Sequence, residues 1–126
     1  MNINLIKICQ DLYKIPRSLT GGGVRETLKY LQKIIPIKIK EVRSGTKVFD
    51  WVVPSEWNIK SAYIIEKETG KKIVDFENHR LHVMGYSEPI NLELSYEDLV
   101  PNLYYLKNQP NAIPYITSYY EKKWGF

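Results

Sequence analysis

The sequence predicts an α+β fold: an N-terminal helix pair followed by a small, mainly antiparallel β domain with one later helix. The first observation is a change of period, because apolar residues recur every three or four positions up to Pro36 and alternate from Ile37. The second is composition, since 44% hydrophobic and 25% charged residues are usual for one soluble globular domain or two very small ones. Disordered and fibrous classes are therefore excluded.

Two helices are expected in the first 36 residues. Within residues 3–14, the three-and-four spacing of one helical face is kept by Leu5, Ile8, Cys9 and Leu12, and Pro16 ends the run. After a glycine-rich turn, the same spacing returns in Val24, Leu28, Leu31 and Ile35 before Pro36. The first face predicts that Cys9 is a small buried hydrophobe.

Short strands are expected through most of the remaining chain, at residues 47–53, 59–66, 73–76, 81–84 and 89–94. Gly70 is expected to supply a positive φ in a hairpin turn. Because Phe49, Trp51 and Val53 alternate along the first strand, we expect the face that they share to lie in the core.

One further helix is expected at about residues 96–106. Ser95 is a good N-cap and is followed by acidic residues, although Pro101 should bend or split the helix. Residues 113–120 are again rich in β-forming residues.

The charge pattern and cysteine usage restrict the partners and the compartment. Residues 1–50 hold ten Lys and Arg against four Asp and Glu, but no basic block interleaved with aromatic residues, so no nucleic-acid partner is expected. No apolar stretch approaches the length of a membrane span, and no membrane partner is expected. The single Cys9 cannot form a disulfide within the chain, which favours a reducing, cytoplasmic compartment.

No residue can be assigned as catalytic or as a metal ligand from spacing alone. His79 and His82 are the only imidazoles, and an odd separation places them on opposite faces of a strand. The three glycines at 21–23 precede a helix, but a helix rather than a strand comes before them, so a flexible connection is favoured over a phosphate loop. No cofactor is therefore expected in this chain.

The aromatic residues allow one binding site to be considered. Three Trp, ten Tyr and three Phe make up 13% of the chain, and aromatic rings beside carboxylates suit the binding of sugars. The candidate glycan-binding set is Asp50, Trp51, Glu56 and Trp57. Acidic turn residues that bond to backbone amides explain the two carboxylates as well.

The run SGTKVFDWVVPSEWNIKSAY at 44–63 resembles a bacterial family of aminopeptidase-like proteins that is associated with polysaccharide biosynthesis. Three more stretches agree with it: PRSLTGGGVRETL at 16–28, LHVMGYSEPI at 81–90 and IPYITSYYEKKWGF at 113–126. The resemblance implies a zinc peptidase fold interrupted by a small inserted domain of unknown function.

By this resemblance, residues 1–36 would be the opening helices of the peptidase domain, 37–108 the inserted β-rich domain, and 109–126 a return segment. The resemblance places the zinc ligands in a segment that would follow Phe126. The chain is therefore expected to be an N-terminal fragment of a zinc-dependent hydrolase and inactive alone. A carbohydrate- or protein-binding β module is the alternative.

The same resemblance supplies the remaining expectations about sites and partners. Arg17, Tyr119, Tyr120 and Trp124 lie in the family's recognisable stretches, where they would line the substrate cleft or pack the junction between domains. The remainder of the peptidase domain is the expected partner. Without it, residues 113–126 would lack strand partners, which favours self-association.

Overall fold

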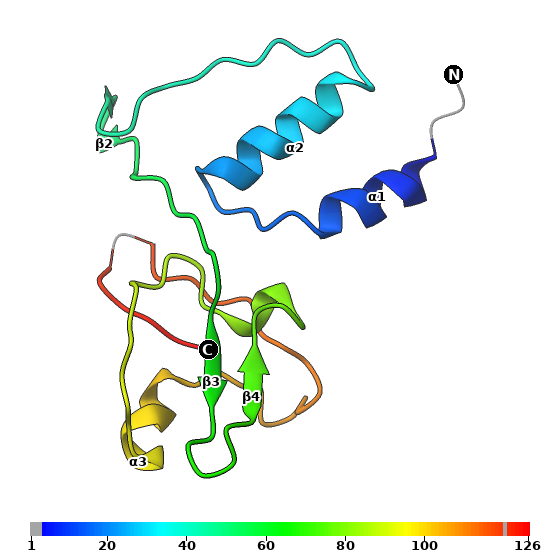
Figure 1. Ribbon diagram of the computed structural model, residues 1–126. Coiled ribbons are helices and arrows are strands. Elements are labelled where there is room, and N and C mark those ends of the chain that lie inside the picture. The colour runs from blue at the N-terminus through cyan, green and yellow to red at the C-terminus, as the bar shows by residue number, and fades with distance from the viewer. Residues whose placement is uncertain (1–3, 120) are drawn as a thin grey trace. The chain divides into compact units, whose positions relative to one another are not determined.

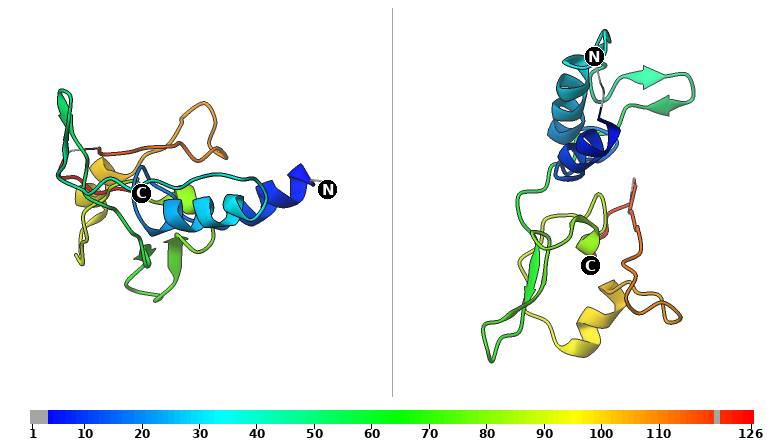
Figure 2. Two further views of the ribbon diagram at one scale, coloured as in Figure 1. Left: turned by 90° about the horizontal axis from the view of Figure 1, so that it is seen from above. Right: turned by 90° about the vertical axis from the view of Figure 1, so that its right-hand side faces the viewer.

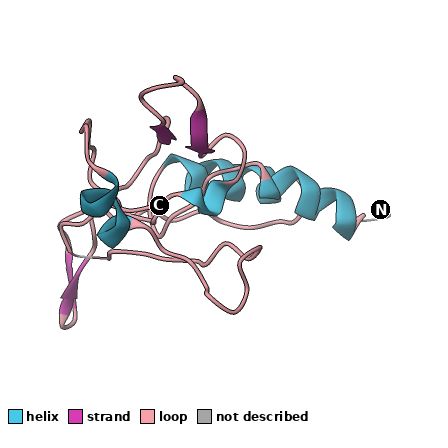
Figure 3. Cartoon of the chain, turned by 90° about the horizontal axis from the view of Figure 1, so that it is seen from below, coloured by secondary structure: helices cyan, strands magenta, loops and turns pink. Residues whose placement is uncertain are grey.

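A computed structural model describes residues 4–119 and 121–126 (Figure 1). The chain divides into two compact units, Met1–Ile59 and Lys60–Phe126, which we call unit 1 and unit 2. Helices and short antiparallel hairpins give a mixed α+β fold, as predicted. Much of the chain runs as loop between these elements (Figure 3).

Unit 1 begins with the two predicted helices, α1 at Leu5–Tyr13 and α2 at Gly22–Gln32. The side chain of Asn4 caps α1 by accepting a hydrogen bond from the amide of Lys7 at 3.1 Å. The two helices lie side by side, and the hydroxyl of Tyr30 on α2 donates to Asp11 Oδ2 on α1 at 2.9 Å.

The predicted buried face of α1 is only partly correct. Ile8 and Leu12 are half-buried, whereas Leu5 is 70% exposed and Cys9 is exposed as well. The physical reason is that α2 covers one side of a helix whose apolar sector is wider than the contact. Cys9 is therefore not the buried hydrophobe that the spacing predicted.

The strand expected at 47–53 is a tight hairpin instead, formed by β1 at Lys47–Val48 and β2 at Trp51–Val52. Phe49 lies in the turn with a φ of 53° and is 92% exposed. Trp51 is 48% exposed, so the prediction that this face lies in the core is wrong. A reversal of the chain at Phe49 breaks the alternation on which that prediction depended.

The first hairpin of unit 2 agrees with the prediction. Strand β3 at Tyr63–Ile65 pairs antiparallel with β4 at Lys72–Asp75, and Gly70 has a φ of 69° in the connecting turn. Gly70 is suited to this position because a residue without a side chain adopts positive φ at little cost.

The next segments differ from the predicted strands. Residues 80–82 form a 3-10 turn, η1 at Arg80–His82, in which the amide of Leu81 donates to Nδ1 of His79 at 3.1 Å. Residues 89–94 carry no assigned strand. The predicted helix is split: α3 covers Tyr96–Leu99 and η2 covers Val100–Asn102.

The helix start and its interruption were both predicted correctly. The hydroxyl of Ser95 accepts from the amide of Asp98 at 3.2 Å, and Pro101 lies where the helical conformation changes.

The core of the described chain lies in unit 2, where Phe76, Val83 and Met84 are buried. Residues 113–119 form no strand, although Thr117 makes an isolated parallel bridge with Gly85. The amide of Met84 donates to the carbonyl of Gly125 at 3.0 Å, which ties the C-terminal segment to the core. That segment thus has hydrogen-bonding partners in unit 2.

Two expectations remain open at this level of the structure. The predicted domains 1–36, 37–108 and 109–126 stay predictions, since the two compact units mark contacts rather than evolutionary domains. Among the described residues, no helix is long and apolar enough to cross a membrane.

Candidate functional site

Tyr119, one of the candidate substrate residues, lies in a group of aromatic side chains in unit 2. The rings of Tyr86 and Tyr119 meet edge to face with their centroids 5.2 Å apart. The hydroxyls of Tyr115 and Tyr119 are 2.9 Å apart and share a hydrogen bond. We call Tyr86, Tyr115 and Tyr119 the tyrosine cluster.

The backbone of Tyr86 is held in an unusual conformation. Its φ of 67° lies in the left-handed region, which a bulky residue rarely adopts. The buried hydroxyl of Ser118 donates to the carbonyl of Tyr86 at 2.9 Å, and the amide of Ser118 donates to the carbonyl of Gly85 at 2.9 Å. These bonds hold the strained backbone of Tyr86 in place.

Within the tyrosine cluster, Tyr115 is a neutral phenol. The hydrogen bond to Tyr119 is the largest cause that raises the pKa of Tyr115 to about 12, and partial burial adds to it. Tyr115 is therefore protonated at neutral pH and is no general base there. Its ring is 68% exposed and can offer both an aromatic face and a hydroxyl to a ligand.

The two other candidates in this stretch differ in what can be said of them. Trp124 is half-buried, and its ring meets that of Phe126 edge to face at 6.5 Å. Tyr120 lies outside the described residues. Trp124 thus shows the contacts of a packing residue, and its role at a cleft stays a prediction.

Arg17, the remaining candidate for substrate binding, lies in unit 1. Its Nη1 donates to the carbonyl of Leu12 at 2.6 Å, near the C-terminus of α1, and to Thr27 Oγ1 at 3.4 Å. A cation is favoured at that end of a helix because the last carbonyls carry partial negative charge. These bonds give Arg17 a structural role, whereas a contact with substrate stays a prediction.

The four candidate glycan residues fall into two separate pieces of unit 1. Asp50 and Trp51 belong to the β1–β2 hairpin and are exposed, while Glu56 and Trp57 lie in the segment that follows it. Glu56 forms a two-pronged ion pair with Arg25 on α2, at 2.5 and 2.7 Å. The bond from Arg25 is the main cause that holds the pKa of Glu56 below its usual value.

Segment 55–58 is bonded to the glycine-rich loop, and we call this arrangement the clasp. The amide of Gly22 donates to Asn58 Oδ1 at 2.7 Å, so Asn58 caps helix α2 from a distant part of the chain. Ser18 Oγ donates to the carbonyl of Trp57 at 3.2 Å, and Thr20 Oγ1 donates to the carbonyl of Ser55 at 3.2 Å. The glycines therefore serve a helix start that the protein itself caps, which agrees with the predicted connection between helices.

Sequence reasoning missed Arg25 and Asn58. One signal existed for Asn58: Gly21 stands at the N-cap of α2 without a side chain, so the free amides of the helix need an acceptor from elsewhere. Nothing local pointed to residue 58 as that acceptor.

The described residues do not supply a zinc site. The rings of His79 and His82 have centroids 5.5 Å apart, but Nδ1 of His82 donates to the carbonyl of Asp75 at 2.9 Å. The carboxylate of Asp75 accepts from Lys72 Nζ at 2.9 Å and from the amide of Glu77 at 3.0 Å, and the Lys72 bond is the main cause of its lowered pKa. In the part of the chain that the structure describes, no three His, Cys, Asp or Glu side chains gather around a common point.

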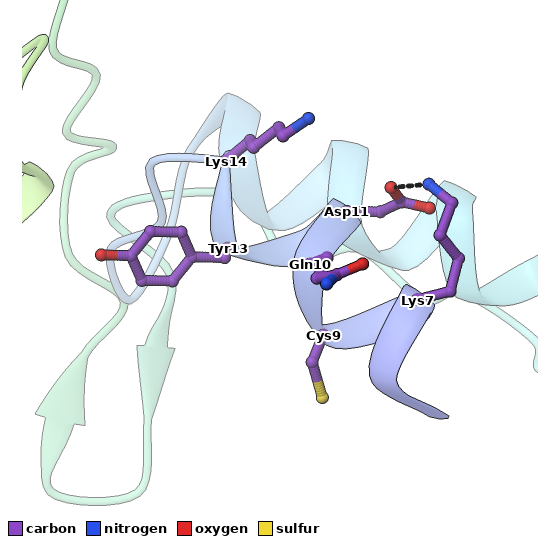
Figure 4. A pocket seen from close by; sticks show the side chains of 6 residues that line it. All are labelled: Lys7, Cys9, Gln10, Asp11, Tyr13 and Lys14. Atoms are coloured by element: carbon purple, nitrogen blue, oxygen red, sulfur yellow. Dashed lines mark hydrogen bonds and ion pairs between the residues drawn. The ribbon is translucent and has the colours of Figure 1, made fainter. Parts of the chain in front are cut away.

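One shallow hollow opens on α1, as Figure 4 shows. Lys7 and Asp11 form an ion pair along one side of it, and Cys9 points away from the helix. The residues that line the hollow are Lys7, Cys9, Gln10, Asp11, Tyr13 and Lys14. All of them come from one helix and its end, so the hollow has no opposing wall to enclose a substrate.

Comparisons with known proteins agree on one family. The model of a family described as "Domain of unknown function (DUF2172)" matches residues 56–126. A curated protein of Clostridium acetobutylicum, named "Putative polysaccharide biosynthesis protein with aminopeptidase-like domain", is 47% identical over 122 residues. The match covers 97% of this chain and 28% of that protein, so the chain spans little more than a quarter of its relative's length.

A solved structure gives the same result for the fold. The crystal structure of a "putative peptidase" from Clostridium acetobutylicum matches 95% of this chain with a TM-score of 0.91 and 48% sequence identity. The match covers 28% of that longer chain. The resemblance stated from the sequence is thereby confirmed.

Proposed function

The chain belongs to the DUF2172 family, and from that premise we propose that it is part of a zinc-dependent, aminopeptidase-like hydrolase. The observation that carries the proposal is the 47% identity to a protein whose name includes an aminopeptidase-like domain. A level of identity this high over nearly the whole chain supports a common role for the two segments. We also propose a cytoplasmic location, because the single Cys9 suits a reducing compartment.

In this proposal, the catalytic centre lies outside the 126 residues. The His, Cys, Asp and Glu side chains that the structure describes do not converge as zinc ligands, and the carboxylates of Asp75 and Glu56 are engaged by Lys72 and Arg25. The chain alone should therefore bind no stoichiometric zinc and release no amino acids from a peptide. Its contribution to the reaction is positioning and binding.

The tyrosine cluster is the part of the chain that we propose to face the substrate, with Trp124 and Tyr120 nearby in the sequence. The exposed hydroxyl of Tyr115, which stays protonated because its pKa is raised to about 12, can donate to a carbonyl or a carboxylate of a bound peptide. For unit 1, we propose separately that Arg17 contacts substrate, through guanidinium nitrogens beyond its bond to the carbonyl of Leu12.

A carbohydrate-binding module is the second candidate function, and one observation favours it. The β1–β2 hairpin extends away from the helix pair (Figure 2, right) and carries Phe49 and Trp51 at 92% and 48% exposure. Exposed aromatic rings beside the carboxylate of Asp50 suit stacking on a sugar ring with hydrogen bonds to its hydroxyls.

Three measurements test the main proposal. The gene is read beyond the codon for Phe126, the complete product and the 126-residue chain are purified, and both are assayed for zinc by elemental analysis and for amino-acid release from aminoacyl anilides. We expect zinc and activity in the complete product alone. Zinc and activity in the 126-residue chain would show that the catalytic centre is misplaced, and an inactive complete product would refute the enzyme proposal.

A glycan array separates the second candidate from the first. Binding that is lost in Trp51→Ala, with the stability of the chain retained, would establish the carbohydrate-binding function. The matched control is Tyr96→Ala, because Tyr96 is an exposed aromatic residue, at 72%, that lies outside the β1–β2 hairpin and outside the candidate glycan-binding set.

A further inference from the structure

Helix α1 carries more apolar surface than α2 covers. On the α2 side, Ile8 and Leu12 are half-buried, and Asp11 accepts the hydroxyl of Tyr30. At about 100° per residue, positions 5, 6, 9 and 13 share a neighbouring sector of the same helix. That sector is turned away from the contact with α2.

We call this sector the outer stripe of α1, and it consists of Leu5, Ile6, Cys9 and Tyr13. Leu5 is 70% exposed, Ile6 is 69% exposed and Tyr13 is 65% exposed. Figure 4 shows Cys9 and Tyr13 pointing outward from the helix. Neighbouring turns of a helix place such residues in contact, so the stripe is one continuous apolar surface.

The rest of unit 1 does not compensate for this exposure. Among its described residues, no hydrophobic side chain is buried, whereas Phe76, Val83 and Met84 form a buried core in unit 2. A unit of this size needs an apolar core to fold alone, and a stable monomer rarely leaves its helices open on an apolar side. Unit 1 thus has the character of a piece of a larger domain.

We propose that the outer stripe of α1 is the surface on which the remainder of the peptidase-like protein packs. This inference rests on the proposed function, since it takes the rest of that protein as the occupant. The length of the relatives supports the choice, because this chain covers 28% of a solved chain whose matching part has the same fold. In that solved chain, the part that does not match is more than twice as long as the matching segment, which is 48% identical to this chain. A remainder of that length is enough to cover one helix face.

Cys9 is a built-in reporter for this surface. Its thiol is exposed in the 126-residue chain and lies in the middle of the stripe. Cleavage by trypsin after Lys7 and Lys14 gives one peptide that contains it, so other cysteines of a longer protein do not interfere. Alkylation by iodoacetamide, read on that peptide by mass spectrometry, measures the access to Cys9.

The experiment compares the complete gene product in its native state with the same protein unfolded in guanidinium. If the stripe is covered, we expect native Cys9 to react at least about tenfold more slowly than in the unfolded state, since labelling then requires local opening. The 126-residue chain should react at close to the unfolded rate. Ile6→Ser in the complete product should restore fast labelling. Lys14→Ser, on the polar side of the same helix, should leave the protection unchanged, and in this control the peptide with Cys9 ends at Arg17 instead of Lys14.

Each outcome decides one question. Fast labelling in the native complete product, or a gene that ends at Phe126, overturns the inference. Protection that appears in the 126-residue chain with rising concentration makes a second copy the occupant and also overturns it. Protection in a complete product that lacks peptidase activity supports this surface and refutes the proposed function, so the two failures are distinct.

Discussion

The docking of the C-terminal segment in unit 2 can be tested with two glycines that differ in the space around them. A Cβ added to Gly125 would lie 2.6 Å from Cε2 of Tyr104 and 3.0 Å from the carbonyl oxygen of Asn102. A Cβ added to Gly85 would lie 3.4 Å from its nearest neighbour, in the side chain of Thr117, which is an ordinary contact. Neither glycine has a positive φ, so alanine suits both backbones.

The expected effects have opposite signs. Replacement of glycine by alanine stabilises a protein by about 0.4–1 kcal/mol where the backbone permits it, because the unfolded chain loses freedom. Gly85→Ala should therefore be neutral or slightly stabilising. At Gly125, crowding costs about 1–3 kcal/mol and exceeds the gain from the unfolded chain, so the net loss should reach up to about 2.5 kcal/mol.

The neighbours of Gly125 have little room to move. The amide of Phe126 donates to Asn102 O at 2.9 Å, and the amide of Tyr104 donates to Phe126 O at 2.8 Å. The carbonyl of Gly125 accepts from Met84 at 3.0 Å in the same region. A shift that relieves the contact with Tyr104 would lengthen these bonds.

Urea unfolding followed by circular dichroism measures both variants. In thermal unfolding, each kcal/mol of lost stability should lower the Tm of a unit of this size by about 4–8 °C. Light scattering on Gly125→Ala also tests the predicted self-association, which should increase if residues 113–126 are released. Equal stability of Gly85→Ala and Gly125→Ala would show that the segment does not dock as described.

Three further predictions follow from single side chains. Trp51→Ala should cost about 1–2 kcal/mol in chemical unfolding, below the loss for a buried Trp, because half of the ring is exposed; a loss above that range would mean that the hairpin is buried. Tyr119→Phe should return the pKa of Tyr115 from about 12 toward its usual value in an absorbance titration, and the stability that this raised pKa gives to the parent protein should be lost as the pH rises between those values. Because Arg25 lowers the pKa of Glu56, their pair should stabilise unit 1 above the usual pKa of a glutamate and lose that effect as the pH falls; Arg25→Ala should flatten this acid dependence slightly, as for an exposed pair, and an unchanged profile would contradict it.

The elements that local sequence determines were predicted well. The spacing before Pro16 and Pro36 gave both helices, Gly70 gave the turn of the β3–β4 hairpin, and Ser95 gave the start of α3. In each of these, the capping residue, the breaker or the positive φ lies within a few positions of the element, so the sequence alone contains the cause.

The strand predictions failed where a distant segment decides the conformation. Residues 81–84 have β-forming side chains, but the imidazole of His79 caps a 3-10 turn there and Met84 bonds to Gly125. Residues 113–119 are also β-prone, yet only Thr117 finds a bridge, to Gly85. Propensity for a strand needs a neighbouring strand in register, and among the residues that the structure describes neither segment has one.

In the candidate site too, local features could be predicted and contacts between distant segments could not. The resemblance named Tyr119, whose ring contacts that of Tyr86 in the structure, and its role at a substrate cleft stays a prediction. Nothing in the sequence pointed to Tyr86, because its unusual backbone conformation is held by Ser118, which lies more than thirty positions away. Glu56 was proposed as a ligand for sugars on local grounds, and its partner Arg25 could be found only in three dimensions.

The clasp has a consequence for where the family's segment can be cut. The family match begins at residue 56, whereas unit 2 begins at Lys60, and the residues between them include Glu56 and Asn58. These two side chains bond to Arg25 and Gly22 at the start of α2. A shortened chain that ends before residue 56 would lack Asn58, the distant cap of α2, and Glu56, the partner of Arg25. The amide of Gly22 would then have no acceptor from Asn58. The start of the DUF2172 match is therefore joined by hydrogen bonds to helix α2, which precedes it in the chain. Helix α2 takes its N-terminal cap from the matched segment.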